Sequence, residues 1–64
     1  MNQEELREKC RFLKWNKGIQ YSEIAEAINM NKNSFYNFIS GRQAKLGYKH
    51  YQLLINYVKE KMYG

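Results

Sequence analysis

The 64-residue sequence has few of the residues that build covalent or metal cross-links. It holds one cysteine, Cys10, which cannot form a disulfide within the chain, and Cys10 with a single histidine cannot complete a zinc site. We therefore expect no metal, no cofactor and a reducing, cytoplasmic compartment.

Proline is absent, and no apolar run approaches the length of a membrane span. The first five residues are polar and acidic, unlike the basic start and apolar run of a secretion signal. No Ser/His/Asp set, carboxylate pair or glycine-rich phosphate loop can be assembled. These absences predict a soluble protein that is not an enzyme and does not bind a membrane.

Charge is unevenly distributed along the sequence. The net charge is +5, and residues 1–26 hold five acidic and five basic side chains, which cancel. Residues 27–58 hold no acidic side chain, against the basic Lys32, Arg42, Lys45 and Lys49. A region of one sign attracts phosphate, as a nucleic-acid interface requires, although a basic surface also serves solubility.

The apolar residues recur at helical spacing, which predicts one all-α domain of four helices over residues 1–64. The predicted helices span residues 3–16, 21–28, 32–40 and about 48–61. Asn2 is the expected N-cap of the first helix, and Gly18 is expected to end it in a left-handed conformation.

A tight turn separates the second and third predicted helices. Asn29 can adopt a positive φ almost as easily as glycine, and Asn31 is a strong N-cap. Between them, Met30 can fill a gap in the core. Gly41 is expected to end the third helix. The order is therefore helix, short turn, helix.

The segment from Gly18 to Arg42 reads GIQYSEIAEAINMNKNSFYNFISGR. It resembles the helix-turn-helix of the Cro and phage-repressor (XRE-like) family, in which a helix with a buried alanine is followed by a turn, an apolar plug and a second helix that ends in glycine. The matching residues are Ala25, Asn29, Met30, Phe35, Phe38 and Gly41. The resemblance implies a DNA-binding domain from a bacterial or phage-infected cell.

Two positions depart from the family pattern. Tyr21 stands where members usually carry glutamine, so a phosphate contact there would come from the Tyr21 hydroxyl or from Gln20. Ile39 stands where an acid is often found, which suggests that its side chain packs inward. With one helix after the motif where many relatives have two, the chain would be a minimal version.

The third predicted helix has the two faces that a helix in the major groove needs. At about 100° per residue, Phe35, Phe38 and Ile39 cluster on one side and polar side chains on the other. Asparagine can pair with adenine, lysine with guanine, and a tyrosine ring can contact the thymine methyl group. We expect base contacts from Lys32, Asn33, Tyr36 and Asn37. A solvated helix also has a polar stripe, although such faces usually include glutamate.

The family geometry also implies a set of side chains near the sugar-phosphate strands. Such contacts position a DNA-binding module without specifying sequence. The residues are Gln20, Tyr21, Asn31, Ser40, Arg42 and Lys45.

Two apolar strips lie outside the predicted core. Phe12 and Trp15 are on the first helix, and Leu53 and Tyr57 are on the last. They can pack on each other, or they can form a twofold interface that sets two recognition helices about 34 Å apart, one DNA turn. The second arrangement predicts a homodimer.

The sequence leaves three functions open. The first is a repressor-like transcriptional regulator that binds double-stranded DNA. The second is a phage inhibitor or antitoxin-like protein, which keeps the helix-turn-helix scaffold but binds a protein partner through its aromatic surface. The third is single-stranded nucleic-acid binding by stacking on tyrosines. The acid-free half favours the first, because a protein-binding surface does not need it.

Overall fold

A computed structural model describes residues 1–63, and these residues form four α-helices and no β-strand. The helices are α1 (Gln3–Lys17), α2 (Tyr21–Ala27), α3 (Lys32–Ser40) and α4 (Tyr48–Tyr63). The predicted all-α class with four helices is confirmed for this part of the chain. Helix α3 has the expected bounds, whereas the ends of α1, α2 and α4 differ from expectation by one or two residues.

Local capping signals set both ends of α1 and of α3. The Asn2 side chain accepts a hydrogen bond from the Glu5 amide at 2.7 Å, and the Gly18 backbone is left-handed with φ of 70°. Gly41, with φ of 89°, ends α3 in the same way. Caps of this kind satisfy amides and carbonyls that have no partner within the helix. Helix α4 continues to Tyr63, two residues beyond its predicted end.

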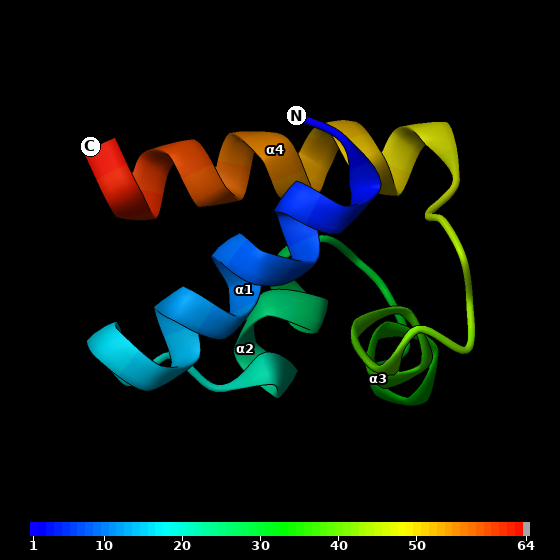
Figure 1. Ribbon diagram of the computed structural model, residues 1–64, viewed down its shortest axis with the longest axis horizontal. Helices are drawn as coiled ribbons and strands as arrows, with labels where there is room; N and C mark the ends of the chain where they lie inside the picture. Colours follow the sequence, from blue (N-terminus) through cyan, green and yellow to red (C-terminus); the bar gives the residue numbers. More distant parts are fainter. Residues whose placement is uncertain (64) are drawn as a thin grey trace.

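The helices pack in two layers (Figure 1). Helix α4 lies along one side of the molecule, and α1 and α2 both contact it. Helix α3 contacts α1 and α2, and Figure 1 shows it nearly along its axis while the other helices are seen from the side. Helices α2 and α3 therefore run in clearly different directions, and residues 41–47 connect α3 to the start of α4.

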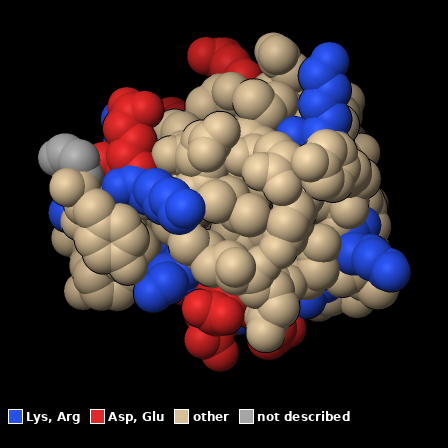
Figure 2. Space-filling view, turned by 90° about the horizontal axis from the view of Figure 1, so that it is seen from above, with Lys and Arg blue, Asp and Glu red and all other residues tan. Residues whose placement is uncertain are grey.

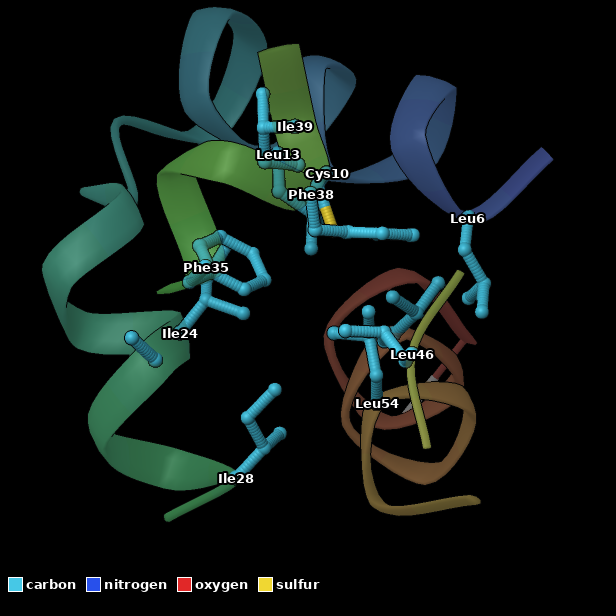
Figure 3. Packing of buried hydrophobic residues seen from close by; sticks show 12 residues of the cluster. Leu6, Cys10, Leu13, Ile24, Ile28, Phe35, Phe38, Ile39, Leu46 and Leu54 are labelled. Carbon is cyan, nitrogen blue, oxygen red and sulfur yellow. The ribbon is translucent and has the colours of Figure 1, made fainter. Parts of the chain in front are cut away.

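All four helices contribute side chains to one core (Figure 3). Phe35 and Phe38 of α3 are fully buried, and each such side chain stabilises the fold by about 1.5 to 3 kcal/mol. Ile39 is only 8% exposed, so it packs inward as expected. The other buried apolar residues are Leu6, Cys10, Leu13, Ile24, Ala25, Ile28, Leu46, Leu54 and Val58. This core fixes the inner face of α3 and leaves its outer face to solvent.

Cys10 lies within this core and is fully buried. Burial raises the pKa of its thiol to about 12, a shift that the nearby Arg11 guanidinium opposes. At neutral pH the side chain is therefore an uncharged, apolar group that packs as part of the core.

Helices long and apolar enough to cross a membrane are not found within residues 1–63. Nor does this part of the chain bring together three or more His, Cys, Asp or Glu side chains that could hold a metal ion.

Candidate nucleic-acid interface

The turn between α2 and α3 is held by its own residues. Asn29 has φ of 56°, and the Met30 amide donates to the Ala25 carbonyl at 2.8 Å. The Asn31 side chain then accepts from the amides of Asn33, at 2.8 Å, and Ser34, at 3.4 Å. Met30 is half-buried against the core. Because the hydrogen bonds of the turn all lie within a few residues, local contacts set the start of α3 at Lys32, and Met30 anchors the turn to the core.

The outer face of α3 is polar and free of acidic side chains. Every predicted base-contacting residue is exposed on this face: Lys32, Asn33, Tyr36 and Asn37. The buried Phe35, Phe38 and Ile39 hold the opposite face against the core. The structure therefore brings the four predicted residues together on one accessible helix surface.

Tyr36 is supported by aromatic contacts beneath it. It is 42% exposed, and its ring meets the ring of Tyr21 edge to face, with centroids 5.9 Å apart. Tyr21 also contacts Phe35, at 6.1 Å, and the Lys14 ammonium lies 4.6 Å from the Tyr21 centroid. Edge-to-face pairs contribute about 0.5 to 1.5 kcal/mol each. These contacts restrict the orientation of the Tyr36 ring on the outer face.

The predicted sugar-phosphate contacts are mostly exposed. Tyr21 is the exception: it is half-buried, and burial raises the pKa of its hydroxyl, an effect that Arg11 opposes. The Ser40 hydroxyl donates to the Asn37 carbonyl at 3.2 Å, and Asn31 already caps α3. The exposed residues are Gln20, Asn31, Ser40, Arg42 and Lys45.

Arg42 and Lys45 lie in the segment between α3 and α4, and neither forms an ion pair within residues 1–63. The ion pair found within residues 1–63 joins Arg7 to Glu4, both in α1. Two exposed cations without acidic partners are available to an anionic ligand such as phosphate.

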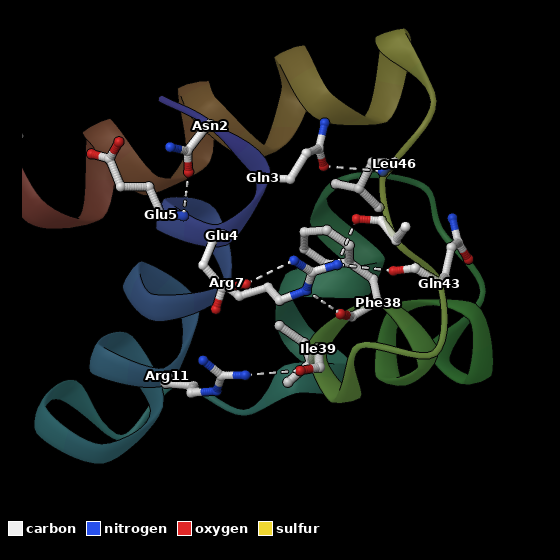
Figure 4. Close-up of polar contacts among 11 residues, drawn as sticks. Asn2, Gln3, Glu4, Glu5, Arg7, Arg11, Phe38, Ile39, Gln43 and Leu46 are labelled. Atoms are coloured by element: carbon white, nitrogen blue, oxygen red, sulfur yellow. Dashed lines mark hydrogen bonds and ion pairs between the residues drawn. The ribbon is translucent and has the colours of Figure 1, made fainter.

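Arg7 is the structurally important residue that sequence reasoning missed. It is 7% exposed, and its guanidinium stacks on Phe38 with Cζ 4.5 Å from the ring centroid. Its Nε donates to the Phe38 carbonyl at 2.7 Å, and one terminal nitrogen donates to the carbonyls of Gln43 and Ala44, at 3.0 and 2.6 Å (Figure 4). The available sequence signal is the four-residue spacing of the polar Gln3, Arg7 and Arg11 beside the apolar stripe of α1.

The four apolar residues predicted to form an interaction surface do not form one exposed patch. Phe12 and Trp15 are 42% and 78% exposed, whereas Leu53 and Tyr57 are half-buried against the core. Phe12 and Met62 line a hollow of about 470 Å³ between α1 and α4. At 100° per residue, Leu53 and Tyr57 project from the other flank of α4 than Met62.

The face of the molecule that carries α4 is mostly uncharged (Figure 2). One basic side chain lies across the left part of this face, and the other Lys, Arg, Asp and Glu side chains lie nearer the margin of the view. A face of this composition suits contact with another protein better than contact with phosphate.

No protein-family model, curated protein or solved structure matches the chain. Its function is therefore inferred from its own residues and their arrangement.

Proposed function

We propose that this protein is a sequence-specific regulator of transcription, repressor-like, that binds double-stranded DNA in the cytoplasm of a bacterial or phage-infected cell. In this proposal α2 and α3 are the two helices of a phage-repressor-like helix-turn-helix, and α3 enters the major groove. The observation that carries the proposal is the exposed, acid-free outer face of α3, with its four base-contacting candidates side by side.

The chemistry of that face suits base edges. The amides of Asn33 and Asn37 offer the donor and acceptor pair that matches adenine N7 and N6. Lys32 can donate to guanine, and the Tyr36 ring can contact a thymine methyl group. Each good contact of this kind discriminates against the wrong base by about 1 to 3 kcal/mol.

The residues on either side of α3 are suited to contact the sugar-phosphate strands of DNA. Arg42 and Lys45 follow the C-terminal end of the helix, and Gln20 precedes α2. Residues 27–58 carry no acidic side chain that would repel phosphate. A helix-turn-helix domain uses such contacts to set the depth and angle of its recognition helix.

The test is selection of bound sequences from a random duplex library, followed by affinity measurements across a salt series. We expect an enriched motif that binds at least about 10³-fold more tightly than scrambled duplex. Asn33→Ala and Tyr36→Ala should each reduce this preference. The matched controls are Asn56→Ala and Tyr63→Ala, which remove the same residue types from exposed positions of α4. No enrichment, or equal loss in the controls, would overturn the proposal.

A protein-binding role is the second candidate, and the exposure of Phe12 and Trp15 favours it. Large exposed aromatic side chains are typical of an interface, either with a partner protein or with a second copy in a homodimer. If a protein partner is the main target, Trp15→Ala abolishes activity in the cell while Lys32→Ala and Asn33→Ala leave it unchanged. Sedimentation of the wild type and Trp15→Ala distinguishes the homodimer.

A further inference from the structure

The loop of residues 41–47 is held by α1 as well as by hydrogen bonds among its own residues. Its local hydrogen bonds are few: Gly41 and Gln43 donate their amides to the carbonyls of Phe38 and Asn37, at 3.2 and 3.0 Å, and the Gln43 side-chain amide donates to the Lys45 carbonyl at 3.0 Å. Other groups of the loop pair with residues more than thirty positions earlier. The Gln43 and Ala44 carbonyls accept from Arg7, and the Leu46 amide donates to the Gln3 side chain at 3.1 Å.

Gln3 and Arg7, which hold the loop, lie along one line of α1 with Arg11, which contacts only α3 (Figure 4). Gln3, Arg7 and Arg11 follow each other at four-residue spacing, which places them on the same side of the helix. Arg7 and Arg11 also donate to the carbonyls of Phe38 and Ile39, at 2.7 and 3.0 Å. These carbonyls belong to the last turn of α3, where the regular i to i+4 hydrogen bonds end and a positive charge is favourable.

Arg7 holds the backbone of the two residues that lie between the loop cations Arg42 and Lys45. The carbonyls of Gln43 and Ala44 face its guanidinium, and the exposed Arg42 and Lys45 flank these two residues. Without such contacts, an irregular loop has many backbone conformations, and ordering it on a ligand reduces affinity. A loop that is already held keeps its cations in one place before the ligand arrives.

We propose that Arg7 is a positioning residue for phosphate binding, which fixes the loop so that Arg42 and Lys45 contact the DNA backbone beside α3. This inference rests on the proposed function, because it names which loop contacts the phosphates and which buried group holds it there. Arg7 itself is buried and does not touch DNA.

The guanidinium is suited to this role by its shape. Its nitrogens donate in fixed directions within one plane, here to α3, to the loop and to Glu4. A lysine ammonium keeps the charge, but its three donors share one nitrogen, so it cannot reproduce the separate positions from which Nε serves α3 and a terminal nitrogen serves the loop. Arg7→Lys therefore changes the geometry of the loop while leaving the net charge of the protein unchanged.

The test measures the slope of log binding constant against log salt concentration for the selected duplex. Each phosphate contact contributes about 0.9 to this slope on duplex DNA. We expect the double variant Arg42→Gln/Lys45→Gln to lower the magnitude of the salt slope by about 2. We expect Arg7→Lys to lower it by about 1 to 2. Circular dichroism at the same temperature measures the helix content and so checks that each variant is folded. The matched control is Arg11→Lys, which leaves the loop contacts intact and should keep the wild-type slope.

A double-mutant comparison separates positioning from any direct effect of Arg7. In the Arg42→Gln/Lys45→Gln background, Arg7→Lys should produce no further change of slope. If the slope falls there as much as in the wild type, Arg7 does not act through the loop cations and the inference is wrong.

Gln3→Ala provides a second variant should Arg7→Lys fail to fold. It removes the acceptor of the Leu46 amide, so it should lower the slope in the same direction by a smaller amount, whereas Gln3→Glu keeps the acceptor and the slope. If the wild type binds a selected duplex but Arg7→Lys, or in its place Gln3→Ala, keeps the full slope, the inference fails and the proposed function stands. The same holds if Arg42→Gln/Lys45→Gln keeps the full slope. Absence of DNA binding by the wild type overturns both.

Discussion

The two connections on either side of α3 are built in opposite ways. The turn before α3 depends on residues within it, through the positive φ of Asn29 and the cap of Asn31. The loop after α3 depends on Arg7 and Gln3, far away in the sequence. One end of the candidate recognition helix is thus set by local conformational preference, and the other by tertiary hydrogen bonds.

This difference has a consequence for stability and binding. A local turn forms early and survives many changes elsewhere in the chain, whereas a loop held by a remote side chain exists only when α1 is docked. We therefore expect substitutions in α1 to alter the phosphate-contacting loop, and substitutions in the turn to alter the start of α3.

Arg7→Ala should have the largest effect. It removes the donor to the Gln43 and Ala44 carbonyls, one of the two donors to the Phe38 carbonyl and the contact with the Phe38 ring, so the free energy of unfolding should fall by about 3 kcal/mol. Urea unfolding followed by circular dichroism measures the change. A loss below about 1 kcal/mol would show that the carbonyls find water or other donors, against the importance given to Arg7.

Asn29→Val should come next. A β-branched side chain is poorly tolerated at a φ of 56°, so we expect a loss of about 2 kcal/mol in the free energy of unfolding. Asn29→Gly is the control, because glycine adopts this conformation freely and should leave stability within about 0.5 kcal/mol of the wild type. Equal losses for both variants would show that the Asn29 side chain, rather than its backbone, holds the turn.

Asn31→Ala should destabilise the protein by about 1 kcal/mol, because the first amides of α3 lose the acceptor that caps them. Asn31→Asp keeps an oxygen in place and should retain most of the stability. Thermal unfolding of the two variants measures the difference. If Asn31→Ala is as stable as the wild type, the start of α3 does not depend on its cap.

Glu4→Gln should have the smallest effect. Glu4 pairs with Arg7 at 3.0 Å, but its side chain is 63% exposed, and exposed ion pairs contribute about 0.2 to 1 kcal/mol. We expect a loss below about 0.5 kcal/mol in urea unfolding. A loss comparable to that of Arg7→Ala would mean that the ion pair, rather than the backbone carbonyls, makes Arg7 important.

The sequence predicted those features that depend on neighbouring residues. The bounds of α3 follow from the cap Asn31 and the left-handed Gly41, and both signals are local. The exposed face of α3 follows from its helical period, because Phe35 and Phe38 have to face the core. The candidate base contacts could therefore be named before the structure was known, although their role in binding stays a prediction.

The features that depend on how helices pack could not be predicted in this way. Nothing in the sequence around Arg7 separates a buried guanidinium from a solvated one, since its carbonyl partners come from α3 and the loop. Phe12 and Tyr57 looked like members of one surface, but the packing of α1 against α4 decides which flank each of them occupies.

The burial of Cys10 gives the protein a natural reporter of its own opening. A thiol reagent can react only when the core exposes this side chain, because Cys10 is fully buried and is the one cysteine in the sequence. The labelling rate at neutral pH therefore measures how often α1 separates from the other helices. When reclosing outpaces labelling, that rate is proportional to the equilibrium population of open molecules, which can be followed without any introduced probe.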